Sequence, residues 1–85
     1  FNPTTVISYQ LSVVSDVSLA IYDLQGKKVA GLVDARQRGG SYQVQWNGRD
    51  DAGRVVSSGM YFYRIEARFI DGASTIEARK MLLLR

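Results

Sequence analysis

Residues 58–67 read Ser58-Gly-Met-Tyr-Phe-Tyr-Arg-Ile-Glu-Ala67, the most regular alternation in the chain. One side of the alternation holds Tyr61, Tyr63, Ile65 and Ala67. The other side holds Met60, Phe62, Arg64, Glu66 and Arg68. A period of two, with apolar side chains on one face and charges on the other, is typical of a half-buried β-strand. We therefore predict a central strand here, with the other strands packed beside it and opposite it.

The length and composition restrict the protein to one domain without a disulfide framework. The chain has 85 residues, enough for a single domain, residues 1–85, with one modest core. It contains no cysteine and no histidine, so the commonest general base and transition-metal ligand are missing. Its formal charge of +3 is spread along the chain, which is unlike a nucleic-acid-binding surface. No apolar run reaches the length of a membrane span.

The start of the chain gives no export signal. Phe1-Asn-Pro3 opens it abruptly, without a basic and apolar signal segment. We therefore expect a parent protein that extends N-terminal to this segment and carries any export signal.

Short alternating segments recur along the chain, separated by turn signals. We expect strands over residues 5–11, 17–22, 28–33, 42–46, 58–67 and 74–84, with the short apolar pair Val55-Val56 before the central strand. Residues 28–33 are weakened by Gly31 and are placed at an edge, and residues 34–40 are expected to form a polar loop. Asp71-Gly72 predicts a hairpin turn, and Gly26 predicts positive φ in a second one.

This pattern predicts an all-β protein, a small antiparallel immunoglobulin-like β-sandwich of about seven strands. A small barrel is the competing architecture, and the tight turns and short strands favour the sandwich. Trp46 is expected to be a core anchor whose indole N–H finds a partner. The predicted core is Ile7, Tyr9, Leu11, Val17, Leu19, Ile21, Tyr42, Val44, Trp46, Tyr61, Tyr63, Ile65, Met81 and Leu83.

The turn over residues 47–54 contains the weak candidates for a metal site. Asp50 and Asp51 could hold calcium, because hard cations prefer clustered oxygen ligands. Their spacing matches no known ligand loop, and Arg49 and Arg54 flank them. We therefore favour a turn in which the carboxylates accept hydrogen bonds from backbone amides. No cofactor is expected.

Two scattered sets of side chains suggest binding surfaces that the sequence alone does not bring together. Basic residues could converge into a site for anionic glycans, and aromatic residues could form a platform for sugars; solvated or core positions are favoured for both sets. The basic set is Lys27, Lys28, Arg36, Arg38, Arg49 and Arg54. The aromatic set is Tyr22, Tyr42, Phe62 and Phe69. The serines next to glycines lack a histidine partner, so we predict no enzymatic activity.

The chain ends on Leu82-Leu-Leu-Arg85, an apolar stretch that predicts burial on both faces or a waiting partner. Exposed, such a strand promotes aggregation. One interpretation is a central last strand that closes the core, and the other is a strand recognised by another protein.

The arrangement of these residues resembles the type A C-terminal sorting domain of proteins exported by the type IX secretion system. The matching blocks are Phe1-Asn-Pro-Thr-Thr5 with Ile7-Ser-Tyr-Gln-Leu11, Val17-Ser-Leu-Ala-Ile-Tyr-Asp23, the residues Trp46, Gly48, Ser58-Gly59, Tyr61, Tyr63 and Arg64, and Lys80-Met-Leu-Leu-Leu-Arg85. The same pattern is similar to the immunoglobulin-like domain of the flagellar hook-capping protein.

The sorting-domain resemblance implies a non-catalytic module that directs a secreted bacterial protein through the outer membrane to the cell surface. Its partners would be the secretion translocon and the surface-anchoring machinery. The translocon would recognise Lys80, Met81, Leu82, Leu83, Leu84 and Arg85.

Two alternatives remain. The first is a structural subunit of an extracellular fibre or cap, a homo-oligomer assembled by pairing of edge strands. The second is a carbohydrate-binding accessory module.

Overall fold

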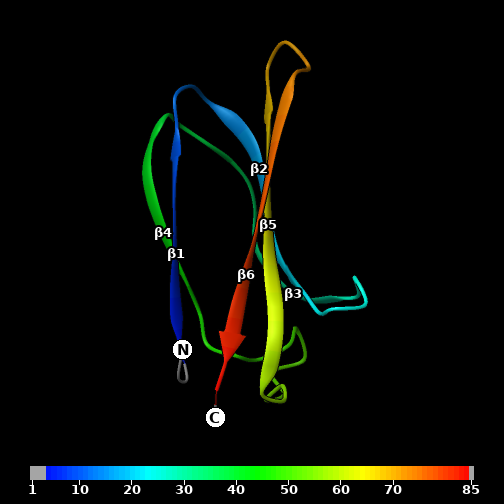
Figure 1. Cartoon of the computed structure of the whole chain (residues 1–85). Coiled ribbons are helices and arrows are strands. Elements are labelled where there is room, and N and C mark those ends of the chain that lie inside the picture. The colour runs from blue at the N-terminus through cyan, green and yellow to red at the C-terminus, as the bar shows by residue number, and fades with distance from the viewer. Residues whose placement is uncertain (1–3, 85) are drawn as a thin grey trace.

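The computed structural model describes residues 4–84, and this range folds into six strands without a helix. The strands are β1 (Thr5–Leu11), β2 (Ser15–Tyr22), β3 (Lys28–Gln37), β4 (Gly40–Trp46), β5 (Gly59–Phe69) and β6 (Ser74–Leu83). They form a two-stranded sheet, β1-β4, and a four-stranded sheet in the order β3-β2-β5-β6 (Figure 1). All pairings are antiparallel.

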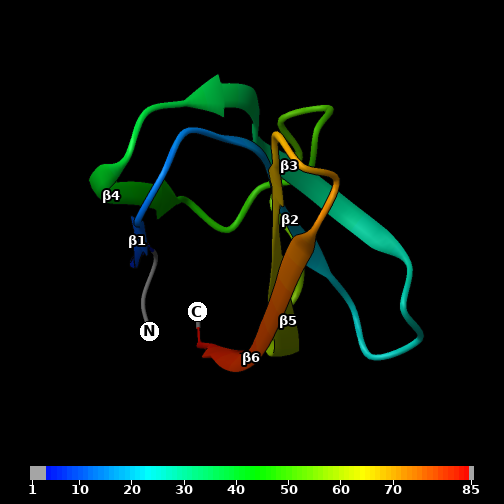
Figure 2. The same ribbon diagram turned by 90° about the horizontal axis from the view of Figure 1, so that it is seen from above.

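The two sheets lie face to face, as the view from above shows (Figure 2). The predicted all-β immunoglobulin-like sandwich is therefore confirmed, with six strands where about seven were expected. Because no helix occurs between residues 4 and 84, that part of the chain has none long and apolar enough to cross a membrane.

The central position of β5 is confirmed. It pairs with β2 on one side and with β6 on the other. Tyr61, Ile65 and Ala67 are buried on its inner face, while Arg64 and Arg68 are exposed on its outer face. The alternation of apolar and charged residues in this part of the sequence therefore corresponds to the inner and outer faces of the strand.

The third strand is longer than predicted, because its polar half also pairs. β3 lies at an edge as expected, but it continues through Asp34 to Gln37, which were assigned to a loop. Arg36 lies opposite Asp16 of β2, and the Arg36 Nε donates to Asp16 Oδ1 over 2.9 Å. Cross-strand pairing of opposite charges supports a strand that composition alone does not indicate.

The apolar pair Val55-Val56 does not form a strand. Val55 makes an isolated bridge to Arg49 and is 53% exposed. The Val56 amide donates to the carbonyl of Gly48 over 3.1 Å, so both residues belong to the closed turn that precedes β5.

The last strand is an edge strand, so the expectation of a central closing strand is wrong. Within residues 4–84, β6 pairs only with β5. It still contributes to the core, because Leu83 is fully buried. β6 therefore forms one edge of the four-stranded sheet, and only every second side chain of β6 points towards the core.

The predicted core is confirmed, since each of its residues belongs to the buried cluster or packs against it. Trp46 is 1% exposed and its ring meets Tyr61 edge to face, with centroids 5.4 Å apart. Tyr9 and Tyr42 stack across β1 and β4 at 5.3 Å. Burial of the Tyr9 ring raises the pKa of its hydroxyl, which donates to Gln37 Oε1. Ala30 and Ala67 complete the cluster. Ala67 lies on the face of β5 that was expected to be apolar, whereas Ala30 was not predicted.

The predicted turns are also confirmed. At the β5–β6 hairpin, the Phe69 amide donates to the carbonyl of Ala73 and Gly72 has φ of 90°. Gly26 has φ of 82°, between β2 and β3, where Asp23 Oδ1 accepts the amides of Gln25 and Lys27. The β5–β6 hairpin extends beyond the other turns and gives the molecule its elongated shape (Figure 1).

Candidate functional site

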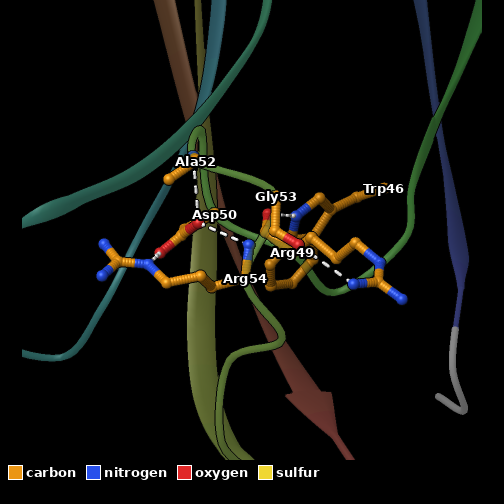
Figure 3. A network of polar contacts seen from close by, with 6 residues as sticks. All are labelled: Trp46, Arg49, Asp50, Ala52, Gly53 and Arg54. Carbon is orange, nitrogen blue, oxygen red and sulfur yellow. Dashed lines mark hydrogen bonds and ion pairs between the residues drawn. The ribbon is translucent and has the colours of Figure 1, made fainter.

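The turn between β4 and β5 is closed by the carboxylate of Asp50 (Figure 3). Asp50 Oδ1 accepts the amides of Ala52 and Arg54, at 3.0 and 2.9 Å. Asp50 Oδ2 accepts the Arg54 Nε at 3.1 Å. These bonds favour the ionised carboxyl group, so the amide of Arg54, above all, lowers the pKa of Asp50.

The same turn is attached to the core through Trp46. The Trp46 Nε1 donates to the carbonyl of Arg49 over 3.0 Å, which confirms the predicted partner for the indole (Figure 3). Arg49 in turn donates from Nη1 to the carbonyl of Gly53 over 3.0 Å. The loop conformation therefore depends on the buried tryptophan.

Asp51 holds the turn against the edge of β3. Its Oδ1 accepts the amide of Gly31 over 2.9 Å, and its own amide donates to the carbonyl of Val29 over 3.1 Å. Main-chain groups of an edge strand are open to pairing with another chain. The turn therefore covers this part of the β3 edge.

The favoured interpretation of Asp50 and Asp51 as turn residues is confirmed by these hydrogen bonds. Among residues 4–84, no cluster of three or more acidic, histidine or cysteine side chains could hold a metal ion. The calcium hypothesis has not been tested by these observations and stays a prediction.

The basic residues do not converge on one site. Lys27, Lys28 and Arg54 line a hollow of about 520 Å³ beside the β4–β5 turn, together with Asp23, Asp50 and Asp51. Arg36 lines a different hollow over β2 and β3, where it pairs with Asp16. Acidic groups thus accompany the basic ones in both places, so an anion site built from the whole set is not formed.

The four aromatic residues do not form a platform either. Tyr42 and Phe69 pack against the core. Tyr22 and Phe62 lie opposite each other on β2 and β5, half-buried on the outer face of the four-stranded sheet. The outer-face pair was not predicted, because it depends on the register between two strands far apart in the sequence.

The C-terminal segment divides between the core and the surface. Met81 is half-buried and Leu83 fully buried, whereas Lys80, Leu82 and Leu84 are exposed. Leu82 is 45% and Leu84 53% exposed. Arg85, the last residue of the predicted recognition segment, lies outside the described residues, as do Phe1 to Pro3.

One side of the sandwich is open, between β1 and β6. The small sheet has two strands and the large one four, so β1 and β6 do not meet. The result is a groove of about 490 Å³. Its lining includes Tyr9, Gln10 and Leu11 of β1, Ile65 and Phe69 of β5, and Thr75 and Glu77 of β6. The groove therefore combines two strand edges with an apolar floor.

The geometry defines an immunoglobulin-like sandwich domain with an open side suited to polypeptide contact. The family model of the FlgD Ig-like domain matches residues 2–69. The chain belongs to this family.

A solved structure supports the assignment. The chain is similar to FlgD from P. aeruginosa, with 29% sequence identity and a TM-score of 0.72. The similarity covers 93% of this chain but 60% of that one, so the chain matches about three fifths of FlgD. A search of curated proteins gave no match. The predicted similarity to the flagellar hook-capping protein is thus confirmed at the level of the domain. The type IX sorting role stays a prediction.

Proposed function

We propose that this chain is a structural, non-catalytic assembly domain, which takes part in building a cap of the flagellar hook type. Its membership of the FlgD Ig-like domain family supports this assignment. The role is the structural alternative considered from the sequence, and the family match favours it over a sorting module.

The observation that carries the proposal is the open side of the sandwich. β1 and β6 each pair with one strand only within residues 4–84, and the groove between them measures about 490 Å³. A strand edge offers main-chain donors and acceptors to an added strand, while pockets along it select the side chains. Copies of the domain would therefore associate through the β1 and β6 edges.

The β3 edge is a poorer place for such an addition. Asp51 already engages Val29 and Gly31 there. The pairing of β2 with β3 also shifts register between Leu19 and Ala20 and between Ile21 and Tyr22. Bulges and covered main-chain groups both discourage pairing at an edge.

Sedimentation velocity over a concentration series tests the proposal. The sedimentation coefficient is expected to rise with concentration for the wild-type chain. Thr75→Lys places a long charged side chain into the groove and is expected to keep the chain monomeric. Ser74→Lys adds the same charge one residue away, opposite Arg68 on the outer face, and serves as the matched control. A wild-type chain that stays monomeric throughout, or two variants that behave alike, would overturn the proposal.

The exposed side chains at the end of β6 make the sorting role a second candidate function. Lys80 and Leu82 are exposed on the edge strand β6, and Leu84 is exposed directly after it, where a translocon could reach them. Deletion of residues 80–85 is a poor test, since it also removes Leu83 from the core. Replacing Lys80, Leu82 and Leu84 together by serine preserves Leu83, and export of a fused cargo is then the readout. Unchanged export would exclude the sorting role.

A further inference from the structure

One residue of the β4–β5 turn, Asp51, takes the place of a strand residue beside β3. In a parallel β-bridge, a residue donates its amide to a carbonyl of the neighbouring strand and accepts, through its own carbonyl, the amide two residues further on. Asp51 donates its amide to the carbonyl of Val29 over 3.1 Å, and its Oδ1 accepts the amide of Gly31 over 2.9 Å. The side-chain carboxylate thus replaces the main-chain carbonyl of an added strand.

These two bonds engage the groups with which β3 would bind another strand. Val29 and Gly31 flank Ala30, and Ala30 is the partner of Ile21 in β2. The groups bound by the turn therefore lie on the side of β3 that faces away from β2. Lys28 adds to the cover, since a Cβ built at Gly31 would lie 3.3 Å from the Lys28 Nζ. A lysine on an edge strand also discourages pairing.

The rest of the turn fixes the position of Asp51. The carboxylate of Asp50 accepts two amides of the turn, and the buried Trp46 donates to the carbonyl of Arg49. Asp51 itself is exposed, so its side chain adds little to the core. The carboxylate of Asp51 therefore acts on the β3 edge, and the turn holds it there.

We propose that Asp51 is an edge-protecting residue, which keeps β3 closed as a second surface for association. Without the carboxylate, the β3 edges of two copies would pair antiparallel about a twofold axis, because identical edges are self-complementary in that arrangement. The occupant of an uncovered β3 edge is therefore a second copy of this chain.

The closed β3 edge also bears on the proposed function. In the intact chain it confines association to the open side between β1 and β6. This consequence rests on the proposed function, whereas the closure of β3 does not.

Asp51→Ala in a Thr75→Lys background tests the closure of β3 alone, because the lysine is placed to block the open side. In sedimentation equilibrium over a concentration series, the Thr75→Lys chain is expected to keep the monomer mass of 9.5 kDa, and the double variant to approach twice that mass. Asp51→Asn keeps an acceptor oxygen for the Gly31 amide and is expected to stay monomeric in the same background. Asp71→Ala is the matched control, because Asp71 Oδ1 also accepts a turn amide, that of Ala73 in the β5–β6 hairpin.

Amide hydrogen exchange of the double variant locates the contact. The Gly31 amide is expected to exchange faster than in the wild type at low concentration and to become protected as the concentration rises, while exchange at Ile65 does not change. Far-UV circular dichroism checks the fold.

The inference would be overturned by association of both alanine variants or of neither, or by association that leaves Gly31 unprotected. Loss of the fold in Asp51→Ala would also overturn it, because the carboxylate would then be needed for stability instead. A wild-type chain that stays monomeric would refute the proposed function alone, since the double variant tests β3 independently.

Discussion

Two neighbouring leucines near the chain end make opposite contributions to the fold, and their replacement by alanine measures the difference. Leu83 is fully buried, whereas Leu82 is 45% exposed on the outer face. Leu→Ala removes three carbon atoms, worth about 2.4 kcal/mol at ~0.8 kcal/mol per buried methylene. The cavity left in a packed core adds to this, so Leu83→Ala is expected to lower the free energy of unfolding by about 3 kcal/mol.

Leu82→Ala is expected to lower the free energy of unfolding by less than about 1 kcal/mol, because water already covers much of the side chain and fills the space left. A domain of 85 residues has a total stability of about 4 to 13 kcal/mol. Loss of Leu83 therefore removes a large part of it, and loss of Leu82 does not.

The assay is urea unfolding followed by the fluorescence of Trp46, which is buried and the only tryptophan. With a urea dependence of about 1 kcal/mol per molar, the Leu83→Ala midpoint falls by about 3 M and the Leu82→Ala midpoint by less than about 1 M. Equal shifts for the two variants would refute the reasoning, because they would show that β6 does not alternate between core and surface.

Three further predictions follow from the turns and the strand edges. The folded-state pKa of Asp50 is lowered, so its ionised carboxyl group stabilises the fold above the unfolded-state pKa, and this contribution is lost as pH falls through the folded-state pKa. The melting temperature should therefore fall less steeply on acidification in Asp50→Asn than in the wild type. A dependence on pH identical to that of the wild type would contradict this. Gly72→Ala should lower the free energy of unfolding in urea by about 1 kcal/mol, because φ is 90° at Gly72, although an added Cβ would meet no atom there. Gly31→Ala is the control and should lower this free energy by less, because φ is not positive at Gly31 and the added Cβ would meet only the flexible side chain of Lys28. Asp51→Ala removes the acceptor of the Gly31 amide, so hydrogen exchange at Gly31 should accelerate while exchange at Ile65 does not change; equal acceleration at both would point to global destabilisation instead.

Much of the fold was predictable because most strands alternate strictly. In β1, β2, β4 and β5 the inward residues are large and apolar, and a register error of one residue would expose them. Trp46, Ile7 and Leu19 were therefore placed in the core from the sequence. A hydrogen-bond partner was expected for the Trp46 indole, but its identity, the carbonyl of Arg49, was not predicted. The hairpin at Asp71-Gly72 followed from local turn chemistry.

The features that were missed depend on contacts between distant segments. Asp34 to Gln37 read as a loop because they are polar, yet Arg36 pairs with Asp16 across the sheet. The edge position of β6 is a matter of strand order, which composition does not encode. Asp51 was recognised as a turn residue, but its bond to Gly31 requires the turn and the β3 edge to meet.

The candidate site was less predictable for the same reason. The segment over residues 80–85 was predicted as one recognition unit, whereas in the structure Leu83 is buried in the core and Lys80, Leu82 and Leu84 are exposed. Tyr22 and Phe62 were noted among the aromatics, but their alignment with Lys80 appears only with the register. The groove between β1 and β6 exists because one sheet has two strands and the other four.

Amide hydrogen exchange at low and high protein concentration tests the assembly role most directly. Strand addition at the open side predicts that amides of β1 and β6 become slower to exchange at high concentration, while Gly31 on the covered β3 edge does not change. Exchange that is independent of concentration at every strand, or protection that appears at β3 instead, would contradict the proposal that the domain assembles through the β1 and β6 edges.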